Sequence, residues 1–226
     1  MYSYKNEMDL QSGDVGINQS FTLKRHILAI MTSFTHLIKN NNYITECKSN
    51  IARDPTSLSS LISRKLSQSD CIKLGIGIEK VLVDIVTDLN PKLRNVKRRN
   101  EPGKKEKDHL FINHDTKTIY YAELKSNINL DTEKSRATYR KCLSIVEKLP
   151  EEFPEQEDYS IKWGLLALRY IDAVAVPPVI KNKYTPIEAN LMGTNQYLAM
   201  LEIDFRFTEE TYIAFLNEVA DAMFES

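Results

Sequence analysis

The 226-residue sequence has little cysteine and no long apolar run, and each absence removes a class of protein. Cys47, Cys71 and Cys142 are odd in number, widely spaced and without a Cys-x-x-Cys pair, which argues against a disulfide framework or a structural zinc site. No apolar stretch is long enough to cross a bilayer, and residues 1–7 lack the apolar core of a signal peptide. We therefore expect a soluble cytoplasmic protein with no membrane partner.

Two common catalytic motifs are also missing. The seven glycines form no glycine-rich phosphate loop, so no nucleotide cofactor is expected. The four histidines make no His-Glu-x-x-His or Cys/His ligand pattern, the usual sign of a zinc enzyme. What the chain does have is 42% hydrophobic residues, enough to bury a substantial core. No linker or repeat divides it, so we predict one domain over residues 1–226, with residues 1–18 polar and loosely ordered.

The apolar spacing predicts helices in the first third of the chain and a mixture of strands and helices in the rest. Helices are expected over residues 27–38, over residues 58–66, from Asp70 as the N-cap to residue 89, from Asp131 or Thr132 to Pro150, and after Thr208 as the N-cap. Strands are expected over residues 107–111, 119–125, 161–170 and 173–176. This order predicts an α/β domain with a mixed central sheet flanked by helices and a helical N-terminal third.

Two of these predicted strands form a hairpin. Residues 107–111 and 119–125 are apolar and aromatic, and residues 114–117 between them are turn-like. We expect antiparallel strands in which Asn113 pairs with Thr118. That register fixes which side chains of the two strands lie opposite each other.

Chemically useful side chains converge on this hairpin. The register places Asp108 opposite Glu123, and side chains two apart on a strand share a face, so Glu123 and Lys125 point the same way. One or two carboxylates with waters and substrate phosphates hold Mg²⁺, and a neighbouring lysine can orient or help to deprotonate a metal-bound water. These residue types suit phosphodiester hydrolysis. The other interpretation is an ordinary surface hairpin whose charged side chains face solvent and have no catalytic role.

At Asp108 and Glu123-Leu124-Lys125 the chain resembles the PD-(D/E)xK nuclease superfamily, most closely the type II restriction endonucleases. The resemblance implies a restriction-endonuclease-like fold and a Mg²⁺ cofactor. It assigns metal binding to Asp108, Glu123 and the carbonyl of Leu124, and water activation to Lys125. It covers roughly the middle of the chain.

Two further positions bear on this resemblance. The family often has a catalytic glutamate on a preceding helix, for which Glu79 is the candidate. Because Glu79 lies beside the apolar stripe of its helix, it is either a solvated residue or a buried acid that faces the metal, and both interpretations stay open. Lys107 stands where the family has proline, which is the least dependable position of the motif.

The net charge of −1 is unusual for a DNA-binding protein, but the basic residues are not evenly spread. Eight of them lie within residues 92–107, including the candidate phosphate ligands Arg98, Arg99, Lys104 and Lys105. The opening turns of the helix after the hairpin add candidates for phosphate or base contacts, namely Lys134, Arg136, Arg140 and Lys141. For this helix, an ordinary solvent face is an equally good interpretation.

Together these features predict a Mg²⁺-dependent type II restriction endonuclease that hydrolyses double-stranded DNA at a specific sequence. A homodimer is expected, because cutting both strands of a palindrome takes two sites and the chain holds one motif set. Two alternatives stay open. One is a DNA repair nuclease or junction resolvase with the same chemistry, and the other is a non-catalytic DNA-binding α/β protein.

Overall fold

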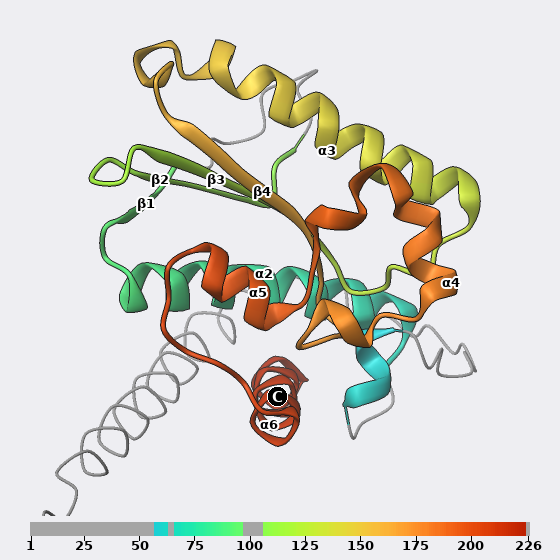
Figure 1. Cartoon of the computed structure of the whole chain (residues 1–226). Coiled ribbons are helices and arrows are strands. Elements are labelled where there is room, and N and C mark those ends of the chain that lie inside the picture. Colours follow the sequence, from blue (N-terminus) through green and yellow to red (C-terminus); the bar gives the residue numbers. More distant parts are fainter. Residues whose placement is uncertain (1–56, 63–65, 97–105, 225–226) are drawn as a thin grey trace, which may run out of the picture.

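The computed structural model of the chain describes residues 57–62, 66–96 and 106–224, which form an α/β arrangement around a five-stranded sheet. Helices cover both faces of the sheet (Figure 1). This confirms the predicted α/β class with a mixed central sheet. Residues 1–18, the helix expected over residues 27–38 and the basic residues Arg98, Arg99, Lys104 and Lys105 lie outside the described residues.

The sheet is mixed, with strand order β1-β2-β3-β4-β5. The first three strands are antiparallel and the last three are parallel. A parallel neighbour needs a crossover, and α3 provides it between β3 and β4. The strands are β1 (Leu93–Asn95), β2 (His109–Asn113), β3 (Thr118–Lys125), β4 (Ser160–Ala167) and β5 (Leu191–Met192).

The hairpin register is the one expected from the sequence. Asn113 pairs with Thr118 and His109 pairs with Ala122, with the turn at residues 114–117. One step further along the same register, Asp108 comes next to Glu123. Thr118 to Leu124 are all buried, because β3 lies in the middle of the sheet and is covered on both faces.

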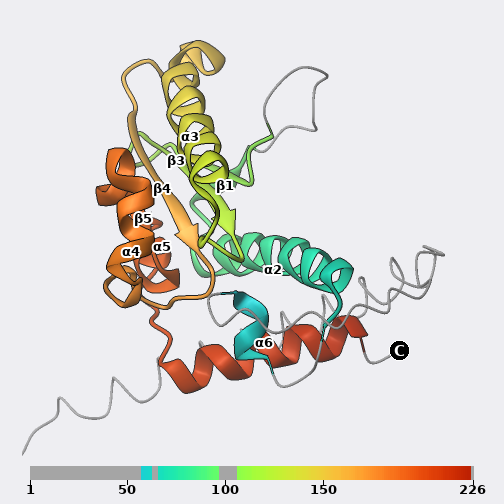
Figure 2. The same ribbon diagram turned by 90° about the vertical axis from the view of Figure 1, so that its right-hand side faces the viewer.

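Helices pack on the two faces as separate layers. Figure 2 shows α2 and then α6 on one side of the sheet and α3 on the other. The larger core joins α2, α5 and α6 to Phe111, Tyr120 and Leu124, whereas α3 packs on Leu110 and Tyr121. None of the described helices is long and apolar enough to cross a bilayer. The longer helices are α2 (Gln68–Leu89), α3 (Thr132–Glu152), α5 (Thr194–Met200) and α6 (Glu209–Phe224).

Helix α2 begins earlier than the sequence predicts. Its N-cap is Ser67, whose hydroxyl accepts from the Asp70 N–H at 3.1 Å and donates to the Asp70 carboxylate at 2.7 Å. The prediction of Asp70 as the cap is therefore wrong by three residues. Asp70 lies instead in the first turn, where its N–H donates to the Ser67 hydroxyl and its carboxylate accepts from that hydroxyl. The helix ends before Asn90-Pro91, as expected.

Helix α3 begins as expected and ends later. Asp131 caps it by accepting from the Lys134 N–H at 2.8 Å. The predicted end at Pro150 is wrong by two residues, because the helix runs through Pro150 to Glu152. A proline lacks one N–H and loses one helical hydrogen bond, but in the last turn the following Phe153 N–H still reaches the Leu149 carbonyl at 3.0 Å.

Three shorter predictions also need correction. The helix expected over residues 58–66 shrinks to a 3-10 turn, η1 (Leu58–Leu61). The strand expected over residues 161–170 ends at Ala167, and the strand expected over residues 173–176 is another 3-10 turn, η3 (Ala173–Ala175). So short a stretch of alanine and valine is compatible with a strand or with a 3-10 turn. The turn forms here because the N–H groups of Ala175 and Val176 donate to the carbonyls of Asp172 and Ala173. The remaining short elements are η2 (Pro154–Gln156), α4 (Pro178–Lys181) and η4 (Asn182–Asn190).

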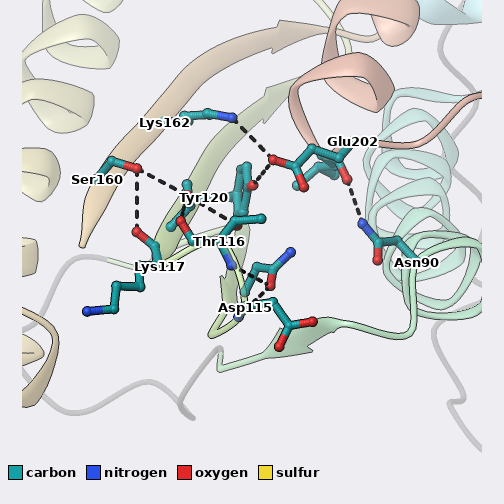
Figure 3. A network of polar contacts seen from close by, with 11 residues as sticks. Asn90, Asp115, Thr116, Lys117, Tyr120, Ser160, Lys162 and Glu202 are labelled. Atoms are coloured by element: carbon teal, nitrogen blue, oxygen red, sulfur yellow. Dashed lines mark hydrogen bonds and ion pairs between the residues drawn. The ribbon is translucent and has the colours of Figure 1, made fainter.

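Polar contacts fasten the turn end of the hairpin to its neighbours (Figure 3). The Glu202 carboxylate accepts from the Tyr120 hydroxyl at 2.8 Å and from Lys162 at 3.3 Å, which joins β3, β4 and the end of α5. Glu202 has a positive φ of 59°, and beside it Asn90 donates to the Leu201 carbonyl at 3.0 Å. This network lies at the opposite end of β3 from Glu123 and Lys125.

Two glycines give a direct test of the packing. A Cβ added at Gly193 would lie 2.6 Å from main-chain atoms of Ile171 and Asp172, whereas one added at Gly75 would meet only Ser126, at 4.0 Å. We expect Gly193→Ala to lower the free energy of unfolding by roughly 1–3 kcal/mol through overpacking. Gly75→Ala should raise it by up to about 1 kcal/mol through helix propensity. Urea unfolding measures both, and equal effects would contradict the packing at Gly193.

Candidate active site

The predicted motif residues meet at the open end of the hairpin. Glu123 and Lys125 share one face of β3, and Asp108 immediately precedes β2. The main-chain N–H of Leu124 donates to the Asp108 carboxylate at 2.7 Å, so the first acid of the motif is fixed to the second strand. The convergence predicted for Asp108, Glu123 and Lys125 is therefore present in the structure.

Glu123 is a fully buried carboxylate, with 0% of its side chain exposed. Lys125 donates to it at 2.7 Å, and Lys141 lies 2.6 Å and 2.8 Å from its two oxygens. The Tyr121 hydroxyl donates at 3.1 Å. A buried charge without partners is strongly destabilising, so these three donors are what allow a charged acid at this position.

Lys141 comes from α3, the crossover helix that follows the hairpin. Its ammonium is also 4.0 Å from the Asp108 carboxylate, so it lies between the two acids. Sequence reasoning counted Lys141 among basic residues for DNA contact and did not place it with the motif. A signal was available, because Lys141 adjoins Cys142, which was expected on the buried face of this helix.

Burial beside a second acid raises the pKa of Asp108 to about 6. Burial is the largest cause and the charge of Glu123 the second, while the Leu124 N–H, Lys141 and Lys125 act in the opposite direction. For Lys125, burial lowers the pKa, but the charge of Glu123 and the hydrogen bond to it outweigh burial and raise it overall. Lys125 is therefore a protonated donor here, suited to orienting a water molecule rather than to removing its proton.

Two other groups beside Glu123 are neutral. Burial, and then the charge of Glu123, raises the pKa of the Cys142 thiol to about 12. The same two causes hold the pKa of Tyr121 far above its usual value. Cys142 is thus a poor candidate for a nucleophile, since the thiolate is the reactive form. Tyr121 serves as a hydrogen-bond donor to Glu123.

A cavity of about 720 Å³ opens beside this site. Its wall includes Asp108 and Lys125, together with Glu79 from α2. Glu79 is half-buried and lines the same cavity as Asp108 and Lys125, so both interpretations of this residue stay open. The rest of the lining comes from η1 and its flanks, the first half of α2 and the segment after β3, including Ser57, Leu66, Ile72, Ile76 and Asn127.

A buried histidine links β2 to α2. His109 follows Asp108, and its Nε2 lies 2.9 Å from the Glu79 carbonyl, which can only accept, so this nitrogen carries the proton. Its Nδ1 then accepts from the Tyr197 hydroxyl. His109 therefore positions the strand that carries Asp108 against the helix that carries Glu79.

Lys107, which stands in place of the family's proline, has a structural partner. It forms an ion pair with Glu152, near the end of α3, at 2.7 Å. This contact ties the segment before Asp108 to the helix that supplies Lys141. Where the family has proline, this chain therefore has an ion pair that holds the residue before Asp108.

The donor set fits a cation held by two acids. Mg²⁺ takes one or two carboxylates plus waters and substrate phosphates, and Asp108, Glu123 and the Leu124 carbonyl are of the right type. Within residues 57–62, 66–96 and 106–224, no cluster of three or more His, Cys, Asp or Glu side chains offers a complete ligand cage. The place of the Lys141 ammonium shows that these two acids stabilise a positive charge between them.

Apart from Lys141, the predicted DNA-binding residues that the structure describes are exposed and form no ion pair or hydrogen bond with Asp108 or Glu123. Lys134, Arg136 and Arg140 are exposed on α3, and Lys134 pairs with Asp131 at 3.0 Å. The other predicted DNA contacts, Arg98, Arg99, Lys104 and Lys105, fall in the segment that is not described.

Comparisons of the chain with protein-family models, curated proteins and solved structures give no match. The resemblance to restriction endonucleases therefore stays a prediction from the motif.

The raised pKa of Asp108 gives a testable pH dependence. The folded protein holds this proton up to a pH of about 6 and the unfolded chain only up to about 3.8, so stability falls as pH rises through this window. Asp108→Asn keeps an acceptor for the Leu124 N–H but removes the charge. In EDTA near pH 8 we expect it to be more stable than the wild type by roughly 1–3 kcal/mol, and the gap should close near pH 4.

Urea unfolding between these two pH values measures the difference. Asp115→Asn is the matched control, because Asp115 is exposed and lies in the hairpin turn. A gap for Asp108→Asn that does not change with pH, or a less stable variant at the higher pH, would contradict the raised pKa of Asp108.

Proposed function

We propose that this protein is a Mg²⁺-dependent deoxyribonuclease with Asp108, Glu123 and Lys125 as its catalytic residues. The observation that carries the proposal is their convergence at the adjoining ends of β2 and β3, on the edge of an open cavity. Carboxylates that hold a divalent cation beside a protonated lysine form a site for phosphodiester hydrolysis.

Each residue of the chain has a defined task in this proposal. Asp108 and Glu123, with the Leu124 carbonyl, would hold the metal. Lys125 donates to the attacking water and orients it for in-line attack. When bound, Mg²⁺ supplies the Lewis acidity that activates water and stabilises the leaving oxygen. Glu79 is a further candidate, because it lines the cavity wall near Asp108 and Lys125.

The finer proposal is a type II restriction endonuclease with a restriction-endonuclease-like fold, acting in the cytoplasm on double-stranded DNA. The support is the motif on a β-hairpin inside a mixed sheet flanked by helices. A duplex presents two strands related by a two-fold axis, so a homodimer with one site per subunit matches a short palindrome. Exposed Arg136 and Arg140 on α3 are proposed phosphate contacts.

Cleavage assays test the catalytic assignment. We expect Asp108→Asn, Glu123→Gln and Lys125→Met each to lower single-turnover cleavage of plasmid DNA in Mg²⁺ by about a hundredfold or more, the usual effect of losing a group that acts in the transition state. EDTA should abolish cleavage, and Ca²⁺ should support binding only. Glu202→Gln is the control, because it alters the polar network at the other end of β3.

The products separate the possible outcomes. Discrete bands with symmetric ends fit a restriction endonuclease, and nicking that depends on DNA structure fits a repair nuclease or junction resolvase. Intact DNA under all conditions, or cleavage that survives in EDTA, would contradict the proposed metal-dependent nuclease.

The two exposed arginines of α3 give a second prediction. Replacing Arg136 and Arg140 together by glutamine should weaken binding to all DNA sequences alike, because phosphate contacts carry no base information. The slope of log affinity against log salt should flatten by roughly two, one for each lost contact. Binding is measured in Ca²⁺ by fluorescence anisotropy, with Lys148→Gln on the same helix as the control. A changed base preference with an unchanged slope would make these arginines base readers.

A further inference from the structure

Lys141 differs from Lys125 in what its ammonium touches. Lys125 donates to one oxygen of Glu123, and both residues lie on β3. Lys141 reaches both oxygens of Glu123 from another element and lies 4.0 Å from Asp108. It is therefore the cation that bridges the two acids of the motif.

A metal ion held by the same two acids would need that place. A Mg²⁺ ion would lie about 2.1 Å from its oxygen ligands, so an ion held by both acids would come close to the ammonium, which lies within 4.0 Å of Asp108 and 2.6 Å of Glu123. Two cations at such a distance repel each other strongly in a partly buried site. Lys141 and the metal cannot both occupy the space between the acids.

Lys141 is also able to leave. Its side chain is 25% exposed, and the preceding Arg140 is exposed while the following Cys142 is buried, so Lys141 lies at the boundary between the buried and open faces of α3. A lysine carries its charge on a flexible four-carbon stem. Rotation about that stem moves the ammonium toward the open side without moving the helix.

We propose that Lys141 is an internal counterion that competes with the divalent metal and, once displaced, contacts a phosphate of the bound DNA. This inference rests on the proposed function. It predicts that metal and DNA help each other to bind, because DNA draws away the ammonium that blocks the metal. By reciprocity the metal strengthens DNA binding by the same factor.

Manganese binding tests the competition without any measurement of cleavage. Mn²⁺ is titrated into the wild type and Lys141→Met by calorimetry, with the free ion followed by electron paramagnetic resonance. We expect Lys141→Met to bind Mn²⁺ more tightly by roughly tenfold, within the usual range of coupling between sites. Lys141→Arg keeps the charge and should stay close to the wild type. Lys148→Met removes an exposed charge further along α3 and should also leave the affinity unchanged.

A second titration adds a phosphorothioate DNA duplex that resists hydrolysis. The duplex should tighten Mn²⁺ binding in the wild type and have a much smaller effect in Lys141→Met, where no ammonium remains to be displaced. An equal effect in both proteins would overturn the phosphate contact. Thermal melting of each variant shows that it is folded, and Lys141→Gln provides a second neutral replacement.

The remaining outcomes separate this inference from the function on which it rests. Mn²⁺ binding to the wild type with equal or weaker binding to both neutral variants overturns the role of Lys141 and leaves the metal site intact. If neither the wild type nor any folded variant binds Mn²⁺, the proposed metal-dependent function and this inference both fail.

Discussion

The buried charge of Glu123 is the constraint on which this region of the molecule depends. A carboxylate with no exposed surface on a fully covered strand requires cationic or hydrogen-bonding partners. One ammonium comes from the same strand and the other from α3, the crossover helix. The packing of α3 on the sheet therefore has an electrostatic part as well as an apolar one. Without Lys141, the Glu123 carboxylate would lose one of its two cationic partners.

The same charge acts on the other groups of the candidate site. Burial, and then the charge of Glu123, raise the pKa of Asp108, whereas for Lys125 burial lowers the pKa and the contact with Glu123 raises it overall. The cavity opens at the carboxyl end of β3, which is where ligands commonly bind in α/β sheets with parallel strands. At the opposite end, Glu202 joins β3 to β4 through Tyr120 and Lys162. The candidate site and this supporting network thus lie at opposite ends of β3.

The sequence predicted local patterns well and contacts between distant elements poorly. The hairpin register followed from two apolar runs and a four-residue turn, which fixed the meeting of Asp108 with Glu123. The Asp131 cap and the end of α2 followed from residue chemistry in the same way. The Ser67 cap was missed because two polar residues near the helix start compete for this role, and only the hydrogen bonds decide between them.

Lys141 shows why the rest could not be predicted. Its role depends on how α3 rotates over β3, which is set by the packing of Leu110, Tyr121 and Cys142 and has no marker in the hairpin itself. The same holds for Glu79, whose access to the cavity depends on how α2 lies beneath the sheet. The 3-10 turn at residues 173–175 was mistaken for a strand because three small apolar residues carry no distinguishing period.

The central claim is that Asp108 and Glu123 together hold a divalent metal. The most direct measurement is anomalous X-ray diffraction from crystals of the protein soaked in Mn²⁺. We predict an anomalous peak about 2.1 Å from an oxygen of each carboxylate, with the Lys141 ammonium moved away from Glu123. Crystals that show no peak between these acids, with Lys141 still bridging them, would contradict the account.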